Sequence, residues 1–132
     1  MERTWLRRHK NGSAISSSQQ LYLHDLLGGI LNYPVGTASL DIAFPDEMIY
    51  LEYDGSGHNL SVKIGQMTQS EFDHRQRRRT YKLYRAGWRA IRIISSKDYL
   101  PHGSEILDLI TQARKSIGAG SSFFEIDIDN AQ

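Results

Sequence analysis

The spacing of apolar residues predicts a helix near the start of the chain. Apolar side chains recur at intervals of three and four residues at Leu23, Leu26, Leu27 and Ile30. This spacing is the period of one helix face. Gly28 and Gly29 interrupt it, so we expect the helix over residues 17–27. Proline and glycine then punctuate residues 32–36, which predicts a loop.

Alternation of apolar and polar positions in residues 39–44 and 49–54 predicts two consecutive strands. The segment from Pro45 to Met48 between them predicts a tight hairpin turn, because proline fixes the entry angle. The apolar side chains expected on one face are Leu40, Ile42, Phe44, Ile49, Leu51 and Tyr53. The opposite face is expected to carry Asp41, Ala43, Tyr50, Glu52 and Asp54.

The register of this hairpin places two acids opposite each other. If Phe44 lies across the turn from Ile49, Asp41 lies directly opposite Glu52. Cross-strand partners have Cβ atoms about 4.5 to 5.5 Å apart, and like charges there are destabilising. We therefore expect a compensating charge, and a divalent cation held by oxygen ligands is the simplest candidate. The alternative is a pair of ordinary acids on a solvated sheet face.

Helices and strands alternate through the rest of the predicted structure. Thr68 and Glu71 have the spacing of a capping box, which opens a helix that Gly87 ends. Residues 88–94 are rich in β-forming side chains and predict a strand. Ser104 is expected to cap a last helix that ends near Gly118, and residues 123–128 predict an edge strand. This order predicts a mixed α/β fold.

Length and composition limit the classes that the protein can belong to. With 132 residues and 39% apolar content, we expect one domain over residues 17–132, preceded by a flexible basic arm at residues 1–16. The absence of cysteine excludes disulfides, thiolate metal sites and cysteine nucleophiles. No apolar run approaches the roughly 20 residues of a membrane helix, and the first residues lack the apolar stretch of a signal peptide. We therefore expect a cytoplasmic protein with no membrane partner.

Charge is segregated along the chain, although the net charge is only +1. No Lys or Arg lies between Lys10 and Lys63, a stretch that contains the acids of the predicted hairpin. The basic residues that follow are Lys63, Arg75, Arg77, Arg78, Arg79, Lys82, Arg85, Arg89 and Arg92. An acidic centre beside a basic helix is typical of a cation site next to a polyanion, and a solvated helix face is the alternative.

Five of the basic residues are candidates for contact with nucleic-acid phosphates: Lys63, Arg75, Arg78, Arg79 and Lys82. Arg79 shares the helical stripe of Phe72 and Leu83, so we expect it to face the acids. Arg75, Arg78 and Lys82 are expected to point outward, where they suit phosphate contacts or solubility alone.

His58 and Gln20 complete the set of candidate site residues. His58 follows a glycine-rich turn after the second strand, and its ordinary pKa of about 6.5 suits proton transfer near neutral pH. Proton transfer, phosphate contact and metal ligation are all open to it, and a surface loop histidine is the alternative. Gln20 shares the inward stripe of Leu23, although Ser17 and Gln20 also have capping-box spacing. Asp54 is a third ligand, a supporting acid or the first residue of the turn.

Three blocks of sequence in fixed order resemble one family. They are Leu40-Asp41-Ile42-Ala43-Phe44, residues 50–58 (YLEYDGSGH) and residues 83–93 (LYRAGWRAIRI). This pattern is similar to the Vsr-like branch of the PD-(D/E)XK nucleases, which includes mismatch-repair nicking enzymes and phage and homing-type endonucleases. The resemblance covers about residues 17–95. It implies a restriction-endonuclease-like fold, with a central mixed β-sheet flanked by helices, and metal-assisted hydrolysis of DNA phosphodiester bonds.

The resemblance also implies a role for each candidate residue. Asp41 and Glu52 would hold Mg²⁺ or Mn²⁺. Asp54 stands where the common pattern has lysine, a departure that is typical of this branch, in which a histidine, here His58, handles the proton. Gln20, or Gln19, stands where the family has a first-helix acid, and its amide would orient a metal-bound water. DNA is the implied partner. Sequence specificity is expected from loops, the terminal arm or an additional specificity domain, and a homodimer would allow both strands to be cut. The alternative is an inactive nucleic-acid-binding module that keeps the fold.

Overall fold

The computed structural model describes residues 17–56 and 60–130, so His58 and the predicted arm at residues 1–16 lie outside the described residues. The elements along the chain are α1 (Ser18–Leu27), β1 (Ile30–Val35), β2 (Ala38–Phe44), β3 (Ile49–Asp54), α2 (Leu60–Lys63), α3 (Gln69–Arg85), β4 (Arg89–Ile94), α4 (Gly103–Gly118), β5 (Phe123–Asp127) and the short 3-10 helix Ile128–Asn130. No helix in the described ranges has the length and apolar content to cross a membrane.

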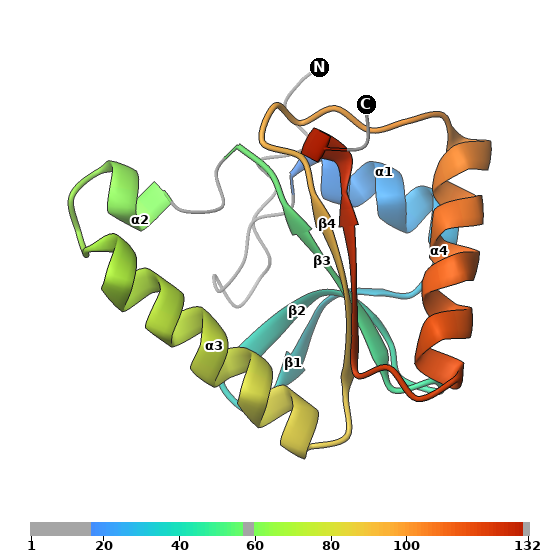
Figure 1. Ribbon diagram of the computed structural model, residues 1–132, viewed down its shortest axis with the longest axis horizontal. Coiled ribbons are helices and arrows are strands. Elements are labelled where there is room, and N and C mark those ends of the chain that lie inside the picture. The colour runs from blue at the N-terminus through green and yellow to red at the C-terminus, as the bar shows by residue number, and fades with distance from the viewer. Residues whose placement is uncertain (1–16, 57–59, 131–132) are drawn as a thin grey trace.

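The strands of the described residues form one mixed sheet in the order β1-β2-β3-β4-β5. The pairs β1–β2 and β2–β3 are antiparallel, whereas the pairs β3–β4 and β4–β5 are parallel. Helices α1 and α4 lie on one side of the sheet and α3 lies on the other (Figure 1). The predicted class, an α/β fold with a central mixed sheet flanked by helices, is therefore confirmed.

The larger apolar core lies between the sheet and the pair α1 and α4. Side chains from every strand except β1 are buried there, and Leu31 of β1 packs against them. The fully or almost fully buried members from strands and helices are Leu23, Ile42, Leu51, Ile91, Ile93, Ile106, Ile110 and Ala113. Burial of so much apolar surface on one face makes this layer the main source of stability.

A smaller apolar cluster lies on the other face and holds the C-terminal part of α3. Leu83 of α3 packs there with Tyr50, Trp88 and Ala90. The Trp88 ring also contacts the ring of Tyr33, with centroids 5.8 Å apart. Most other side chains of α3 are exposed. The helix packs on this cluster near its C-terminal end and also buries Phe72 near its N-terminal end, and Arg79 between them reaches the polar part of the sheet face.

The predicted hairpin register is confirmed. Phe44 pairs with Ile49 across the turn, and Ala43 and Ile42 then pair with Tyr50 and Leu51. The alternation of apolar and polar side chains along the two short strands is enough to fix this register. A slip of one residue would move every apolar side chain to the opposite face.

Residues 32–36 were wrongly predicted as a loop, because most of them belong to β1. This strand pairs with β2 at the edge of the sheet, where Pro34 needs no partner for its missing N–H. The pairing leaves out Asn32 and Asp41, and Asn32 has a φ of 49°. At this interruption the alternation of faces breaks, so Leu40 packs with the smaller cluster and not, as predicted, on the face of Ile42.

Two of the three predicted helix starts have the predicted caps. The Ser17 side chain accepts a hydrogen bond from the backbone N–H of Gln20, and Thr68 and Glu71 form a complete capping box. The prediction of Ser104 as a cap is wrong, because α4 begins at Gly103 with His102 in the cap position. Ser104 is already inside the first turn and has helical backbone geometry, which a cap residue lacks.

Candidate active site

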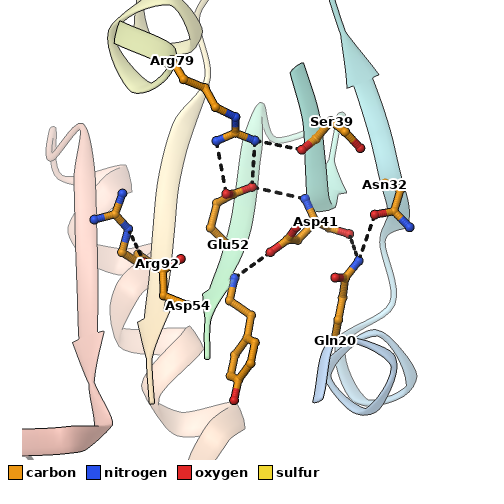
Figure 2. A network of polar contacts seen from close by, with 9 residues as sticks. Gln20, Asn32, Ser39, Asp41, Glu52, Asp54, Arg79 and Arg92 are labelled. Carbon is orange, nitrogen blue, oxygen red and sulfur yellow. Dashed lines mark hydrogen bonds and ion pairs between the residues drawn. The ribbon is translucent and has the colours of Figure 1, made fainter. Parts of the chain in front are cut away.

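Asp41 and Glu52 lie where the paired strands β2 and β3 separate. Backbone pairing ends at Ile42 and Leu51. One residue further along each strand, side chains form the hydrogen bonds between the strands. The backbone N–H of Asp41 donates to Glu52 Oε2 at 3.3 Å, and the backbone N–H of Tyr53 donates to Asp41 Oδ2 at 2.8 Å. At this point a backbone N–H of each strand donates to a side-chain carboxylate of the other strand, where a backbone carbonyl would accept in a regular sheet (Figure 2).

The charge that compensates the two acids in this structure comes from Arg79. Its guanidinium donates to both oxygens of Glu52, at 3.2 and 3.1 Å, and to the carbonyl of Ser39 at 2.8 Å. The side chain of Arg79 thus faces the acids, as its helical stripe indicated. A compensating charge was expected, with a divalent cation as the simplest candidate, and in this structure a base distant in sequence, Arg79, pairs with Glu52.

A second arginine pairs with Asp54. Arg92 on β4 lies 3.0 Å from Asp54 and 4.0 Å from Glu125 on β5. Asp54 is buried, and burial raises the pKa of its carboxyl, whereas Arg92 lowers it. The third predicted acid thus lies on the same face as Glu52, but its pairing with Arg92 makes it part of a separate ion pair.

Gln20 connects α1 with the strand that carries Asp41. Its side-chain amide donates to the carbonyl of Asp41 at 3.0 Å and to Asn32 Oδ1 at 3.2 Å. The side chain is buried, so these partners satisfy an amide that would otherwise be costly. Gln20 therefore fixes the backbone of Asp41, whereas the capping-box alternative holds only for the half supplied by Ser17.

The surroundings of Asp41 disfavour its negative charge. Burial, and then the neighbouring carboxylate of Glu52, raise the pKa of Asp41 well above its usual range. The hydrogen bond from Tyr53 and the charge of Arg79 oppose this shift without cancelling it. An additional cation close to Asp41 would therefore stabilise the charged form of its carboxylate.

A basic groove lies along α3, and Arg79 connects it to the two acids. It has a volume of about 720 Å³ and lies between α3 and the β1–β2 turn. The basic side chains that line it are Arg75, Arg78, Arg79 and Lys82. Arg75, Arg78 and Lys82 are exposed, as predicted, whereas Arg79 reaches inward to Glu52. Four of the five predicted phosphate contacts thus line one groove.

Lys63, the fifth, lies elsewhere, beside the turn that follows β3. Its ammonium group donates to the carbonyl of Ser56 at 2.8 Å. Asp98 binds the same turn: it accepts from the backbone N–H of Ser56 at 3.0 Å and from the Tyr53 hydroxyl at 2.8 Å. A Cβ at Gly55 would clash with the Asp98 carboxylate and the Tyr53 ring, so a larger residue there would displace the side chains that hold this turn. Asp98 was missed by the sequence analysis, since nothing in the local pattern around it indicates a contact with residues so distant along the chain.

The donor atoms of the acid pair are of the kind that Mg²⁺ and Mn²⁺ prefer, since both are carboxylate oxygens. Glu52 would have to exchange Arg79 for the ion, because the guanidinium contacts both of its oxygens. Among residues 17–56 and 60–130, no three His, Asp or Glu side chains form a metal-binding group. The part of His58 remains a prediction, since it lies outside these ranges.

Comparison with protein-family models, with curated proteins and with solved structures finds no significant match to this chain. The activity, the metal and the partner of this protein are therefore inferred from the geometry of the site and from the sequence pattern.

Proposed function

We propose that this protein is a metal-dependent endonuclease that hydrolyses the phosphodiester bonds of DNA. Its active site would contain Asp41 and Glu52. The observation that carries the proposal is the meeting of these two carboxylates at the point where β2 and β3 separate, next to Arg79, which also lines the basic groove. Acids of this kind, next to a surface suited to phosphates, are the elements that metal-assisted phosphodiester hydrolysis needs.

The basic groove would hold the DNA backbone. Arg75, Arg78 and Lys82 project from one side of α3 into the groove and are exposed, so phosphates can reach them without rearrangement. Such contacts position DNA and give affinity that falls with salt, but they read little sequence. Sequence specificity would then come from loops, from the terminal arm or from an additional domain, and a homodimer would cut both strands.

Arg79 belongs both to the groove and to the acid pair. A phosphate that entered the groove would compete with Glu52 for the guanidinium of Arg79, because both are oxyanions that can accept two hydrogen bonds from it. Release of Glu52 would leave its carboxylate and that of Asp41 to hold Mg²⁺ or Mn²⁺. When bound, the ion would polarise the scissile phosphate and lower the pKa of a water.

The other residues would position these groups and move the proton. Gln20 keeps the Asp41 backbone in place through its hydrogen bond to the carbonyl. His58 is the proposed proton carrier, as its ordinary pKa allows both directions of transfer near neutral pH. Asp98 holds the turn that begins at Gly55, ahead of His58 in the sequence.

Cleavage of supercoiled plasmid with Mg²⁺ or Mn²⁺ tests the proposal. We expect nicked or linear product from the wild type, and loss of that product with EDTA and in Asp41→Asn. Asp46→Asn is the matched control, because it removes the same charge from an exposed residue of the hairpin turn. Product that persists in Asp41→Asn, or no product from any DNA form, would contradict the proposed activity.

A second function, DNA binding without catalysis, is favoured by one observation. Glu52 and Asp54 each already have an arginine partner, at 3.1 and 3.0 Å. Titration of the wild type with Mn²⁺, with and without DNA, separates the two functions. An endonuclease should bind the ion more tightly once DNA occupies Arg79, whereas DNA binding with no Mn²⁺ uptake in either state would indicate the inactive module.

A further inference from the structure

A second groove lies along α3, between this helix and the strands β4 and β5. Its volume is about 530 Å³. It differs from the basic groove in its lining, because aromatic rings contribute to both of its walls. Tyr81 and Tyr84 of α3 and Phe123 of β5 line it and are 58%, 44% and 40% exposed. We call it the aromatic groove.

The helical wall of the aromatic groove is a regular stripe. Arg77, Tyr81 and Tyr84 follow one another at intervals of four and three residues, which places them on one side of α3. Phe123 stands on the opposite wall at the start of β5, next to Ala90 in the sheet register. These three exposed rings are gathered in one groove, and an exposed apolar patch of this kind marks a binding surface.

Each of the three rings has a guanidinium beside it. Arg89 lies 4.4 Å from the centre of the Tyr84 ring, Arg92 lies 5.6 Å from that of Phe123, and Arg85 lies 5.8 Å from that of Tyr81. Flat rings bordered by positive charge suit a ligand that is both planar and anionic. Nucleobases on a phosphate backbone have both properties.

We propose that the aromatic groove binds unpaired nucleobases of a nucleic-acid strand. This inference rests on the proposed function and deepens it, because it assigns to the nuclease a substrate that carries a single-stranded segment near the cut. Arg92 supports the connection, since it lines the groove and pairs with Asp54 at 3.0 Å. A strand with bases in the aromatic groove would thus pass beside Asp54, and Arg92 is also next to Glu52 in the sheet register.

The arginines also argue against a second copy of the chain as the occupant. In a twofold dimer the same surface patch meets itself, so the three arginines beside Tyr81, Tyr84 and Phe123 would be brought near three more. A partner of negative charge avoids that repulsion, and stacking on the rings then adds affinity that does not depend on base sequence.

The test measures fluorescence anisotropy of labelled DNA in EDTA, with a blunt duplex and the same duplex carrying a short thymine tail. We expect the wild type to bind the tailed duplex roughly ten-fold more tightly. The preference should disappear in Tyr81→Leu and Tyr84→Leu and survive in Tyr81→Phe, because leucine keeps an apolar surface but cannot stack. Tyr99→Leu is the control: Tyr99 is also 58% exposed but lies outside the groove.

Equal affinity of the wild type for both duplexes would overturn the inference, and so would an equal loss in Tyr99→Leu. Self-association in sedimentation velocity that Tyr81→Leu abolishes would also overturn it, by assigning the groove to a second copy. Failures of the two proposals are distinguishable. A protein that cuts no DNA but keeps a tyrosine-dependent preference for the tail supports this inference alone, whereas one that cuts duplex DNA without any preference supports only the endonuclease.

Discussion

The two faces of the sheet differ in what holds them together. Toward α1 and α4, side chains such as Leu51, Ile91 and Ile93 are fully buried among other apolar groups. Toward α3, the register brings Glu52, Arg92 and Glu125 side by side across three parallel strands. The apolar face stabilises the fold by excluding water. On the charged part of the other face, the fold is stable only if each buried charge has a partner of opposite sign.

This difference separates stability from chemistry within one sheet. Apolar packing depends on volume and is indifferent to direction, so the α1 and α4 face can hold the strands rigidly without constraining the polar groups. The charged face can then carry groups whose interactions are individually unfavourable, such as Asp41 beside Glu52. Substitutions on the two faces should therefore have effects of different size and sign.

The largest loss of stability is expected on the apolar face. Ile91→Ala leaves a cavity between the sheet and the helices and should lower the free energy of unfolding by about 3 kcal/mol. Ile94→Ala is the matched control, because it changes the same residue type on the same strand where the side chain is only half-buried. Urea unfolding of both variants measures the two losses of free energy of unfolding. Equal losses would show that the two faces contribute equally to stability.

Loss of Arg79 should rank second. Arg79→Met leaves Glu52 and Asp41 without their cation, which we expect to cost about 2 kcal/mol, because the side chains of Arg79 and Glu52 are only 25% and 16% exposed. Arg79→Met combined with Glu52→Gln should recover part of that loss. Arg78→Met controls for the change on an exposed neighbour. A double-mutant cycle in urea measures the coupling, and a value near zero would remove Arg79 as the compensating charge.

Asp41→Asn should have a smaller effect of the opposite sign. Burial and Glu52 raise the pKa of Asp41 above its ordinary value, so the folded protein binds more protons than the unfolded chain between those two values. Stability therefore falls as pH rises through that window. Removal of the carboxylate should raise the free energy of unfolding by about 1 kcal/mol near pH 7 and leave it unchanged below the ordinary pKa. Thermal unfolding across pH measures this, with Asp46→Asn as control; a destabilised Asp41→Asn at neutral pH would contradict it.

The smallest effect on stability is expected in the basic groove. Arg75→Ala, Arg78→Ala and Lys82→Ala remove exposed charges and should change the free energy of unfolding by less than about 0.5 kcal/mol. Each should nevertheless weaken DNA binding and reduce the salt dependence of the affinity by about one unit of slope. Lys97→Ala, at an exposed lysine outside the groove, is the control. Unchanged slopes in all three variants would place the DNA elsewhere.

Local patterns predicted the parts of the site that depend on parity and helical spacing. The turn between Phe44 and Ile49 determined which residues face each other, and the stripe of Phe72 and Leu83 gave the direction of Arg79. These features need only a few neighbouring residues. They were therefore predictable without knowledge of the tertiary fold.

Features that depend on distant contacts were not predictable in this way. The ion pair between Arg92 and Asp54, and the contact of Asp98 with Ser56, join segments that only the folded sheet brings together. The strand β1 was hidden by Pro34, which is tolerated because β1 is an edge strand. The face of Leu40 depends on the interrupted pairing at Asn32, a backbone feature without a periodic signal.

The edge strands also determine how the sheet meets other sheets. The outer strand β5 carries Glu125 and Asp127 at alternate positions. A second copy that added to this edge in register would bring like charges together, and the proline of β1 removes one donor at the opposite edge. Both ends of the sheet are thus protected against the edge-to-edge growth that leads to fibrils.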